Sequence, residues 1–336
     1  MHYLNQVIEE VDKTHPHLGN PVAVAMLAIK AKKLLLIVSP RGCGKSRVTS
    51  FVGLSYPNPM LEDRLSVAGL AALGGELNGY QGVLIVDDIA KTQTPYARIT
   101  TVTTLAELVY SHYCKSHLQG SNFEISDFNG AALVNIQPIL LKEIVKSTEW
   151  EASMMDKSMR YYHLYRPQEP NPEPPKIELD WGAATADVSA PELKGKLADE
   201  LKSIGKCQWG LSRLREHIAD LLRASAALDR RGKVTLADYR LLTNLLAPMR
   251  IESLVTDKQE LEAQRYLASN QLAILTEFFT YGSFTLSQLA GDYHLSQGQC
   301  YKIMGRYTKE WVVVSKNPTT YAPTDELRKR LKGVKL

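Results

Sequence analysis

The sequence predicts an α/β protein in which a mostly parallel sheet is covered by helices on both faces. Over the first 165 residues, short apolar runs alternate with stretches of helical periodicity, which is the pattern of strands joined by helical crossovers. The runs are nearly continuous in apolar residues, as expected for strands buried on both faces. Two of them end in polar groups at the edge where open α/β sheets bind their ligands. The expected strands are Leu34–Val38, Val83–Val86, Gly130–Pro138 and Met159–Tyr165.

The first strand leads into a loop that is suited to bind phosphate. Gly42 and Gly44 permit positive φ and a close backbone approach. The helix that follows directs its N-terminal N–H groups and partial positive charge at an anion. Lys45 suits the β- and γ-phosphates of ATP, and the hydroxyl of Ser46 suits Mg²⁺. The predicted nucleotide-binding residues are Ser39, Pro40, Arg41, Gly42, Cys43, Gly44, Lys45, Ser46 and Arg47.

The match to G-x-x-x-x-G-K-[ST] is imperfect, because Ser39 stands where the first glycine belongs. The alternative interpretation is a glycine-rich turn before a helix that happens to begin with Lys-Ser. The preceding strand and the following helix are the context that the motif requires, and they favour a phosphate loop.

Two further strand ends carry candidate catalytic groups. Asp87 and Asp88 follow Val83–Val86, and we predict that Asp87 joins Ser46 in holding Mg²⁺ while Asp88 orients the attacking water. An acidic turn after a strand is common, so the pair indicates a metal site only because a phosphate loop precedes it in the chain. Asn135 ends the next strand and is a candidate to polarise the γ-phosphate or the water; the alternative is an amide that caps the turn before Pro138.

Composition places the chain among ordinary globular proteins. Its 336 residues allow more than one domain, and 44% hydrophobic with 23% charged residues is typical of that class. No apolar run approaches the roughly 20 residues of a membrane helix, and the N-terminus does not resemble a signal peptide. The cysteines are scattered, which fits a reduced compartment. We expect a cytoplasmic protein without a membrane partner, associated with the nucleoid if the host is prokaryotic or viral.

The pattern changes after residue 165. Six prolines between Pro167 and Pro191 predict an extended linker. Glu192–Leu246 is helical, with Thr235 as an N-cap and Asp238 at the third position after it. Helical periodicity resumes over Leu261–Leu275. The expected units are a nucleotide-binding core at 1–165, a linker at 166–191, a helical lid at 192–250 and a C-terminal domain at 251–336.

The C-terminal domain has the pattern of a winged helix-turn-helix. Short helices with a tight turn at His294–Ser296 precede a hairpin built from Trp311–Ser315 and Tyr321–Pro323. From Tyr266 onward, nine lysines and arginines face five acids, an excess equal to the +4 of the whole chain. Such a module can contact DNA or a partner protein. The predicted DNA-binding residues are Gln297, Gln299, Lys302, Arg306, Lys309 and Lys316.

Residues 30–250 resemble the AAA+ ATPases through SPRGCGKS, VLIVDD and VNIQP, and the helical segment from Gly210 resembles the lid of the minichromosome-maintenance and origin-recognition branch. The resemblance implies a lid arginine that contacts the γ-phosphate, for which Arg213 matches best and Arg215 is the alternative. It also implies assembly into a ring or spiral, such as a hexamer, with ATP between subunits. An arginine finger ahead of the last core strand would complete the neighbour's site. Arg160 matches that place, unless it is merely a charged residue at a strand edge.

The chain departs from the family at the catalytic carboxylate, where Asp88 replaces the usual Glu, which is one methylene longer. We therefore expect slow ATP hydrolysis. The favoured function is an ATP-dependent oligomer that acts on DNA, as an initiator, helicase loader, small helicase or transposition regulator with a replication or recombination partner protein. The alternatives are a protein-remodelling or signalling ATPase whose winged helix binds a partner protein, and a transcription regulator that only binds nucleotide.

Overall fold

The computed structural model describes residues 2–92, 94–118, 121–147, 150, 154–167, 169, 171–173, 177–255 and 267–335. Its centre is a five-stranded parallel sheet with the order β2-β3-β6-β1-β7. The α/β class and the parallel sheet are confirmed. The strands are β1 (Leu34–Val38), β2 (Met60–Glu62), β3 (Val83–Val86), β6 (Ala131–Ile136) and β7 (Ser158–Tyr162).

Strand β2 was not predicted. It is three residues long, lies at the sheet edge and follows a proline-rich turn, so it offers no apolar run to recognise. The helices of this part are α1 (Tyr3–Thr14), α2 (Gly19–Lys30), α3 (Lys45–Ser55), α4 (Val67–Ala72), α5 (Gly74–Leu77), α6 (Pro95–Ser111) and α7 (Pro138–Val145), with a 3-10 turn η1 (Ile89–Lys91).

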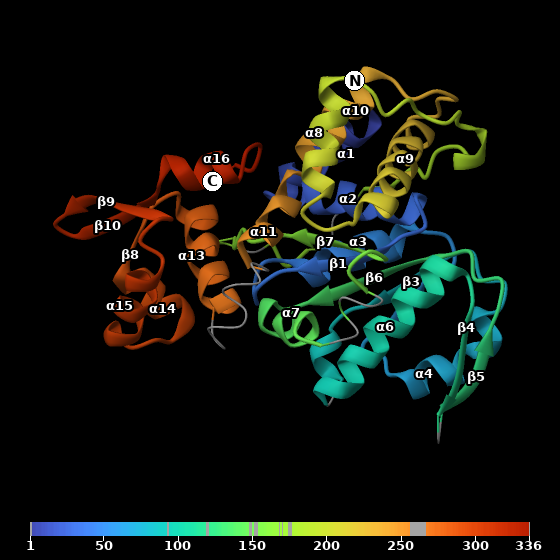
Figure 1. Ribbon diagram of the computed structural model, residues 1–336, viewed down its shortest axis with the longest axis horizontal. Coiled ribbons are helices and arrows are strands. Elements are labelled where there is room, and N and C mark those ends of the chain that lie inside the picture. The colour runs from blue at the N-terminus through green and yellow to red at the C-terminus, as the bar shows by residue number, and fades with distance from the viewer. Residues whose placement is uncertain are drawn as a thin grey trace.

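Helices cover both faces of the sheet, as Figure 1 shows. Because side chains alternate along a strand, β1 contributes to two hydrophobic clusters. Leu35 and Ile37 pack with α1, α2 and α3, while Leu34 and Leu36 pack with α6 and α7. The sheet is therefore buried between two layers, with its carboxyl edge left for ligands.

The long helix expected over Tyr96–His117 is shorter in the structure. Helix α6 ends at Ser111, and His112 adopts a left-handed conformation with φ of 60°. The chain then forms an antiparallel hairpin from β4 (Cys114–Leu118) and β5 (Ser121–Ile125), at the edge of the molecule in Figure 1. The helical prediction failed here because histidine, rather than glycine, ends the helix.

The described parts of the proline-rich segment contain one 3-10 turn, η3 (Thr185–Asp187), and they contact the core. The indole Nε1 of Trp181 donates to the carbonyl of Ser55 at 2.9 Å, and a guanidinium nitrogen of Arg47 donates to the carbonyl of Pro172 at 2.6 Å. These contacts hold the described parts of the segment against the nucleotide-loop side of the core.

The helices after this segment pack on α1 and α2, over one face of the sheet (Figure 1). The predicted cap of α10 is confirmed, because Thr235 and Asp238 form a capping box. The elements are α8 (Lys196–Gly205), α9 (Leu211–Leu228), α10 (Leu236–Leu245), η4 (Ala247–Ile251) and α11 (Glu252–Val255).

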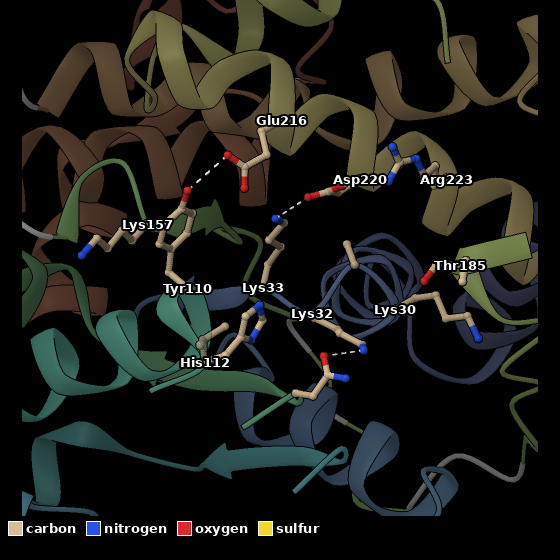
Figure 2. A pocket seen from close by; sticks show the side chains of 14 residues that line it. Lys30, Lys32, Lys33, Tyr110, His112, Lys157, Thr185, Glu216, Asp220 and Arg223 are labelled. Atoms are coloured by element: carbon tan, nitrogen blue, oxygen red, sulfur yellow. Dashed lines mark hydrogen bonds and ion pairs between the residues drawn. The ribbon is translucent and has the colours of Figure 1, made fainter. Parts of the chain in front are cut away.

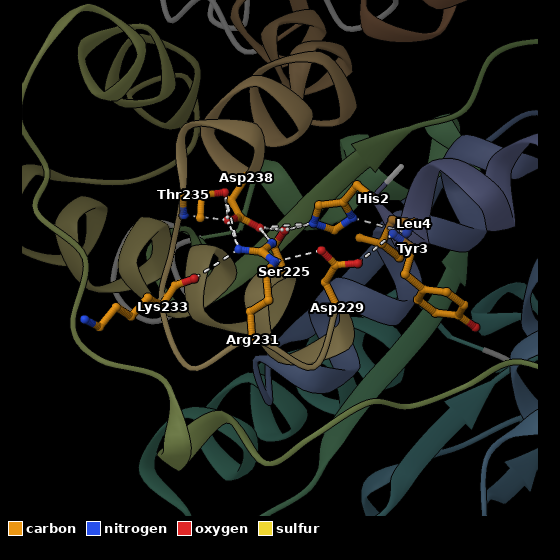
Figure 3. Close-up of polar contacts among 9 residues, drawn as sticks. All are labelled: His2, Tyr3, Leu4, Ser225, Asp229, Arg231, Lys233, Thr235 and Asp238. Carbon is orange, nitrogen blue, oxygen red and sulfur yellow. Dashed lines mark hydrogen bonds and ion pairs between the residues drawn. The ribbon is translucent and has the colours of Figure 1, made fainter.

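A buried carboxylate joins this helical unit to the N-terminus of the chain (Figure 3). Asp238 accepts hydrogen bonds from Ser225 at 2.7 Å and from Arg231 at 2.7 and 2.9 Å, and it lies 3.1 Å from Nε2 of His2. Burial opposes ionisation, but hydrogen bonds from His2, Arg231 and Ser225 hold the pKa of Asp238 well below its ordinary value. The N-terminal helix is thereby fastened to α9 and α10.

The C-terminal unit combines helices with the three-stranded antiparallel sheet β8-β10-β9. The helix expected over Leu261–Leu275 lies partly outside the described residues, and its described part belongs to α13. Phe278 and Phe284 anchor the unit's core, which is continuous with the cluster under α7. The elements are α13 (Leu267–Tyr281), β8 (Phe284–Thr285), α14 (Leu286–Tyr293), α15 (Gln297–Arg306), β9 (Trp311–Lys316), β10 (Thr319–Pro323) and α16 (Asp325–Arg330).

Across the described ranges, none of the helices combines the length and the hydropathy that crossing a lipid bilayer requires.

Candidate functional site

The loop between β1 and α3 has the backbone geometry that phosphate binding requires. Gly42 and Gly44 have φ of 78° and 84°, values that favour glycine. Gly44 is the N-cap of α3 and provides no side-chain cap, so the first N–H groups of the helix are left for another acceptor. Ser39 occupies the first motif position, is buried and donates its N–H to the carbonyl of Ile136 at 3.0 Å. The loop is thus anchored to the neighbouring strand.

A cavity of about 480 Å³ lies over this loop. Lys45 lines it and is only 8% exposed, and in the part of the chain that the structure describes Lys45 forms no ion pair with an acid. Lysine is rarely buried without a partner, so the cavity suits an anion. Of the predicted loop residues, Gly42, Gly44, Lys45, Ser46 and Arg47 line the cavity. The other residues of its lining are His15, Pro16, Leu18, Ser50, Pro167, Glu169 and Asn171.

Four of the predicted loop residues do not line the cavity, namely Ser39, Pro40, Arg41 and Cys43. Arg41 is exposed, and the Cys43 side chain is buried away from solvent. His163, which directly follows β7, places Nε2 2.7 Å from the carbonyl oxygen of Cys43 and is itself buried. Burial lowers the pKa of His163 to about 4, so the neutral ring donates this hydrogen bond at neutral pH. His163 was not predicted, and no motif marks it; only its place after the strand beside β1 could have indicated it.

The predicted strand-end groups meet on one shelf beside the loop. The amide nitrogen of Asn135 lies 3.1 Å from Oγ1 of Thr49 and 3.2 Å from Oδ1 of Asp87, and Thr49 also donates to Asp87 at 3.2 Å. This arrangement follows from the strand order, because β6 lies between β1 and β3. The amide oxygen of Asn135 is buried without a hydrogen-bond partner among the described groups. Such an atom suits a donor supplied by a ligand or a water.

Thr49 is the member of this shelf that sequence reasoning missed. It lies one turn after Ser46 on α3, so the helical spacing could have indicated it. Ser46 itself is exposed toward the cavity. Asp88 is fixed at the same edge, where Oδ1 accepts the N–H of Ala90 at 2.9 Å and caps η1. No set of three His, Cys, Asp or Glu side chains forms a metal site within the described ranges. The donors here are instead Ser46 and Asp87, a hydroxyl and a carboxylate, which suit Mg²⁺ that also takes water and phosphate oxygens.

Arg160 is not an exposed finger. It is fully buried on β7, where its guanidinium pairs with Glu252 at 2.8 Å and stacks 4.8 Å from the ring centre of Trp150. Its remaining N–H groups donate to the carbonyls of Met155, Ser158 and Gln208. The prediction that Arg160 reaches a neighbouring subunit is therefore wrong, because the side chain points into the junction between the sheet and the helical unit.

Arg213 does not lie beside the phosphate loop of its own chain. Its guanidinium carbon is 4.2 Å from the ring centre of Tyr110, at the end of α6, and it pairs with Glu216 at 3.5 Å. Tyr110 lies with Lys33 at the amino edge of the sheet, at the opposite end of β1 from Lys45. Within one chain Arg213 therefore lies away from the phosphate loop, and its contact with a γ-phosphate stays a prediction. Arg215 is exposed on the same turn of α9.

A second cavity, of about 290 Å³, opens at this amino edge (Figure 2). Cations dominate its lining, and only Glu216 and Asp220 oppose them; Lys33 pairs with Asp220 at 2.6 Å. Burial lowers the pKa of Lys30 and Lys32, so both amines lie in a partly dehydrated space. The basic residues of the lining are Lys30, Lys32, Lys33, His112, Lys157 and Arg223.

The predicted DNA-contacting residues lie on α15 and on the hairpin that follows it. Gln297, Lys302 and Arg306 are exposed along α15, Lys309 is exposed on the way into β9, and Lys316 is exposed at the end of β9. The side-chain oxygen of Gln299 accepts the N–H of Ser296 at 2.8 Å, so that residue serves as part of a helix cap. Tyr301, 62% exposed on the same helix, was not predicted.

Comparison with known proteins identifies no relative: no protein-family model and no curated protein matches the chain.

Proposed function

We propose that this protein is a Mg²⁺-dependent ATPase of the AAA+ type that acts on DNA as an oligomer. The observation that carries the proposal is a buried Lys45 with no acidic partner among the described residues, in a glycine loop between β1 and α3, next to the Asp87–Asn135 shelf. A cation suited to bind phosphate, a carboxylate and an amide lie at one edge of the sheet, and phosphoryl transfer uses groups of these kinds.

Each residue of the site then has a role. Lys45 neutralises charge on the transferred phosphoryl group, and the loop N–H groups bind the phosphates. Ser46 and Asp87 supply oxygen ligands for Mg²⁺, which adds neutralisation of the phosphate charge. Asp88 and Asn135 orient water, and Thr49 holds Asp87 and Asn135 in register. Asp88 is short and already caps η1, which supports slow turnover.

The amino-edge cavity supports the self-association part of the proposal. If ATP lies between subunits, a neighbour's phosphates need cations that approach from another chain. Lys157 lines this basic cavity directly before β7, and Arg213 lies beside it over Tyr110. In mixing experiments, a Lys157→Ala chain should reduce the ATPase rate of an otherwise active oligomer, whereas it should have no such effect if each subunit works alone.

DNA is the proposed partner of the C-terminal unit. Its order of helix, strand, two helices and hairpin is that of a winged helix, and its exposed cations and amides lie along α15 and β9. A protein partner is the second candidate, and a specific observation favours it. Val312, Val313 and Val314 are 46%, 40% and 58% exposed on β9, an edge strand of the small sheet. Exposed apolar edge strands are surfaces for pairing with other chains.

An ATPase assay with and without DNA, combined with sizing in ATP, tests the proposal. We expect slow hydrolysis that DNA stimulates, a larger particle in ATP, and DNA binding that weakens steeply with salt. Stimulation by a protein and not by DNA would favour the second candidate. If the protein binds nucleotide but does not hydrolyse it, the transcription regulator is the function that remains. If it does not bind nucleotide, all three functions are refuted.

A further inference from the structure

A single charged cluster joins the C-terminal unit to the phosphate-loop edge of the core. Arg166 follows β7 by four residues, and its Nη1 lies 3.0 Å from Oδ2 of Asp292 and 3.9 Å from Oε1 of Glu277. Its guanidinium carbon is 5.2 Å from the ring centre of Tyr293, and its N–H donates to Thr280 at 3.3 Å. Arg166 thus adds a charged contact to the apolar junction between the core and the C-terminal unit.

The same arginine belongs to the surroundings of the nucleotide loop. Burial raises the pKa of the Cys43 thiol, and the nearby positive charges of Arg166 and Lys45 oppose that rise. The next residue, Pro167, lines the cavity over the loop. Arg166 therefore lies beside the loop and next in sequence to a residue of the cavity lining, where a bound negative charge would attract it.

Glu277 gives the cluster its unusual chemistry. It is fully buried on α13, and no donor among the described residues lies within hydrogen-bond distance of either carboxylate oxygen. Burial, and then the neighbouring Asp292, raise the pKa of Glu277 to about 8, while Arg166 opposes the rise. A protonated Glu277 can donate to Asp292, whereas an ionised one would add a second buried negative charge beside a single arginine.

We propose that Arg166, Glu277 and Asp292 form a latch that seats the C-terminal unit on the phosphate-loop edge, and that a bound triphosphate loosens it. The polyphosphate attracts Arg166, and any weakening of its contact with Asp292 leaves the two carboxyl groups facing each other. The nucleotide part of this inference rests on the proposed function; the latch itself does not.

The latch also has a pH dependence with a definite sign. The groups that face Glu277 are Arg166 after β7, Asp292 and Tyr293 of α14, Tyr281 of its own helix and, through Tyr293, Cys43 of the loop. Burial and Asp292 raise the pKa of Glu277 to about 8 in the docked unit, and undocking would expose the carboxyl to water and make its proton easier to release. Docking therefore weakens as pH rises towards 8, by at most about tenfold per pH unit, and levels off above pH 8.

Hydrogen exchange of the full chain, read by mass spectrometry over residues 272–293, tests the latch. Protection factors, corrected for the intrinsic pH dependence of exchange, are compared with and without Mg²⁺ and a non-hydrolysable ATP analogue. Arg166→Gln removes the cation, Glu277→Gln removes the titrating group at constant shape, and Lys329→Gln removes an exposed cation of α16 as the matched control. Nucleotide affinity is measured in parallel by direct titration.

We expect Arg166→Gln to lower protection about threefold to tenfold without nucleotide and to abolish the further loss that nucleotide causes. The wild type should lose protection between pH 6 and 8, and Glu277→Gln should be flat over that range. Unchanged protection in Arg166→Gln, together with a flat wild-type profile, would overturn the latch. If the protein binds the nucleotide but the nucleotide does not change protection, the coupling between nucleotide and latch is overturned and the latch itself is not. If the protein does not bind the nucleotide, the proposed function is refuted, and the pH profile then decides whether the latch exists.

Discussion

Replacing Arg160 with methionine should destabilise the protein strongly, because this side chain is a buried junction and not a finger. All five N–H groups of its guanidinium have acceptors, supplied by the Glu252 carboxylate and by the carbonyls of Met155, Ser158 and Gln208. Tyr162 also donates to Glu252 at 3.0 Å. The network therefore connects β7 to the loop before α9 and to α11.

The magnitude follows from the charge that the substitution leaves behind. Methionine fills much of the volume, but Glu252, which is 2% exposed, would lose its cation. Removing one partner of a buried ion pair costs about 3–5 kcal/mol. For 336 residues, an unfolding entropy of about 2.1 cal/mol/K per residue corresponds to about 0.7 kcal/mol/K. A single cooperative transition should therefore shift down by about 4–7 °C.

Urea denaturation and calorimetry of the isolated variant measure this effect. Arg213→Met is the matched control, since it removes an arginine that is partly exposed and stacked on Tyr110, and it should cost about 1 kcal/mol or less. The reasoning fails if Arg160→Met is as stable as Arg213→Met, above all if it loses ATPase activity while keeping its stability, because that is the behaviour of a finger.

Three further perturbations probe the site and its supports. Lowering the pH from 6.5 towards 4 should reduce the free energy of unfolding through His163, by up to about 1.4 kcal/mol per pH unit. The reason is that the unfolded histidine binds a proton in this range, whereas the folded one, with a pKa of about 4, does not. In denaturation measured against pH, His163→Gln should lack this contribution to the slope. Gly44→Ala should weaken nucleotide binding in a titration, because φ is +84° and the new Cβ would lie 3.0 Å from Leu18; unchanged affinity would show that the loop is adaptable. Asp238→Asn should lower the free energy of unfolding, measured in urea, by about 2–4 kcal/mol, whereas the control Asp187→Asn, at an exposed position, should change it very little. Equal losses in the two variants would contradict the network in Figure 3.

The groups that the sequence could predict are those whose roles depend on local spacing. Lys45 follows a strand and two glycines, and Asp87 and Asn135 end apolar runs, so parallel strands alone place them at one sheet edge, and the strand order brings Asp87 and Asn135 into contact. The cap formed by Thr235 and Asp238 is likewise local.

The predictions that failed concern side chains whose positions depend on packing between segments far apart in the chain. Arg160 was placed by its position relative to strands and helices, but the direction of its side chain is decided by Glu252, far away in the chain. His163 was missed for the same reason, since its partner is the loop carbonyl of Cys43. Sequence periodicity indicates which face of an element is buried, but not which partner a buried polar group finds.

Direct titration of the protein with a fluorescent ATP analogue and Mg²⁺, for the wild type and for Lys45→Ala, tests the central claim. Lys45 is buried and lines the cavity over the loop, so its removal takes a buried cation away from the proposed phosphate site. We predict saturable binding by the wild type and at least about tenfold weaker binding by Lys45→Ala, since a charge-assisted contact is worth about 1.5–3 kcal/mol. Equal affinity of the two proteins, or binding by neither, would contradict a triphosphate site at this loop.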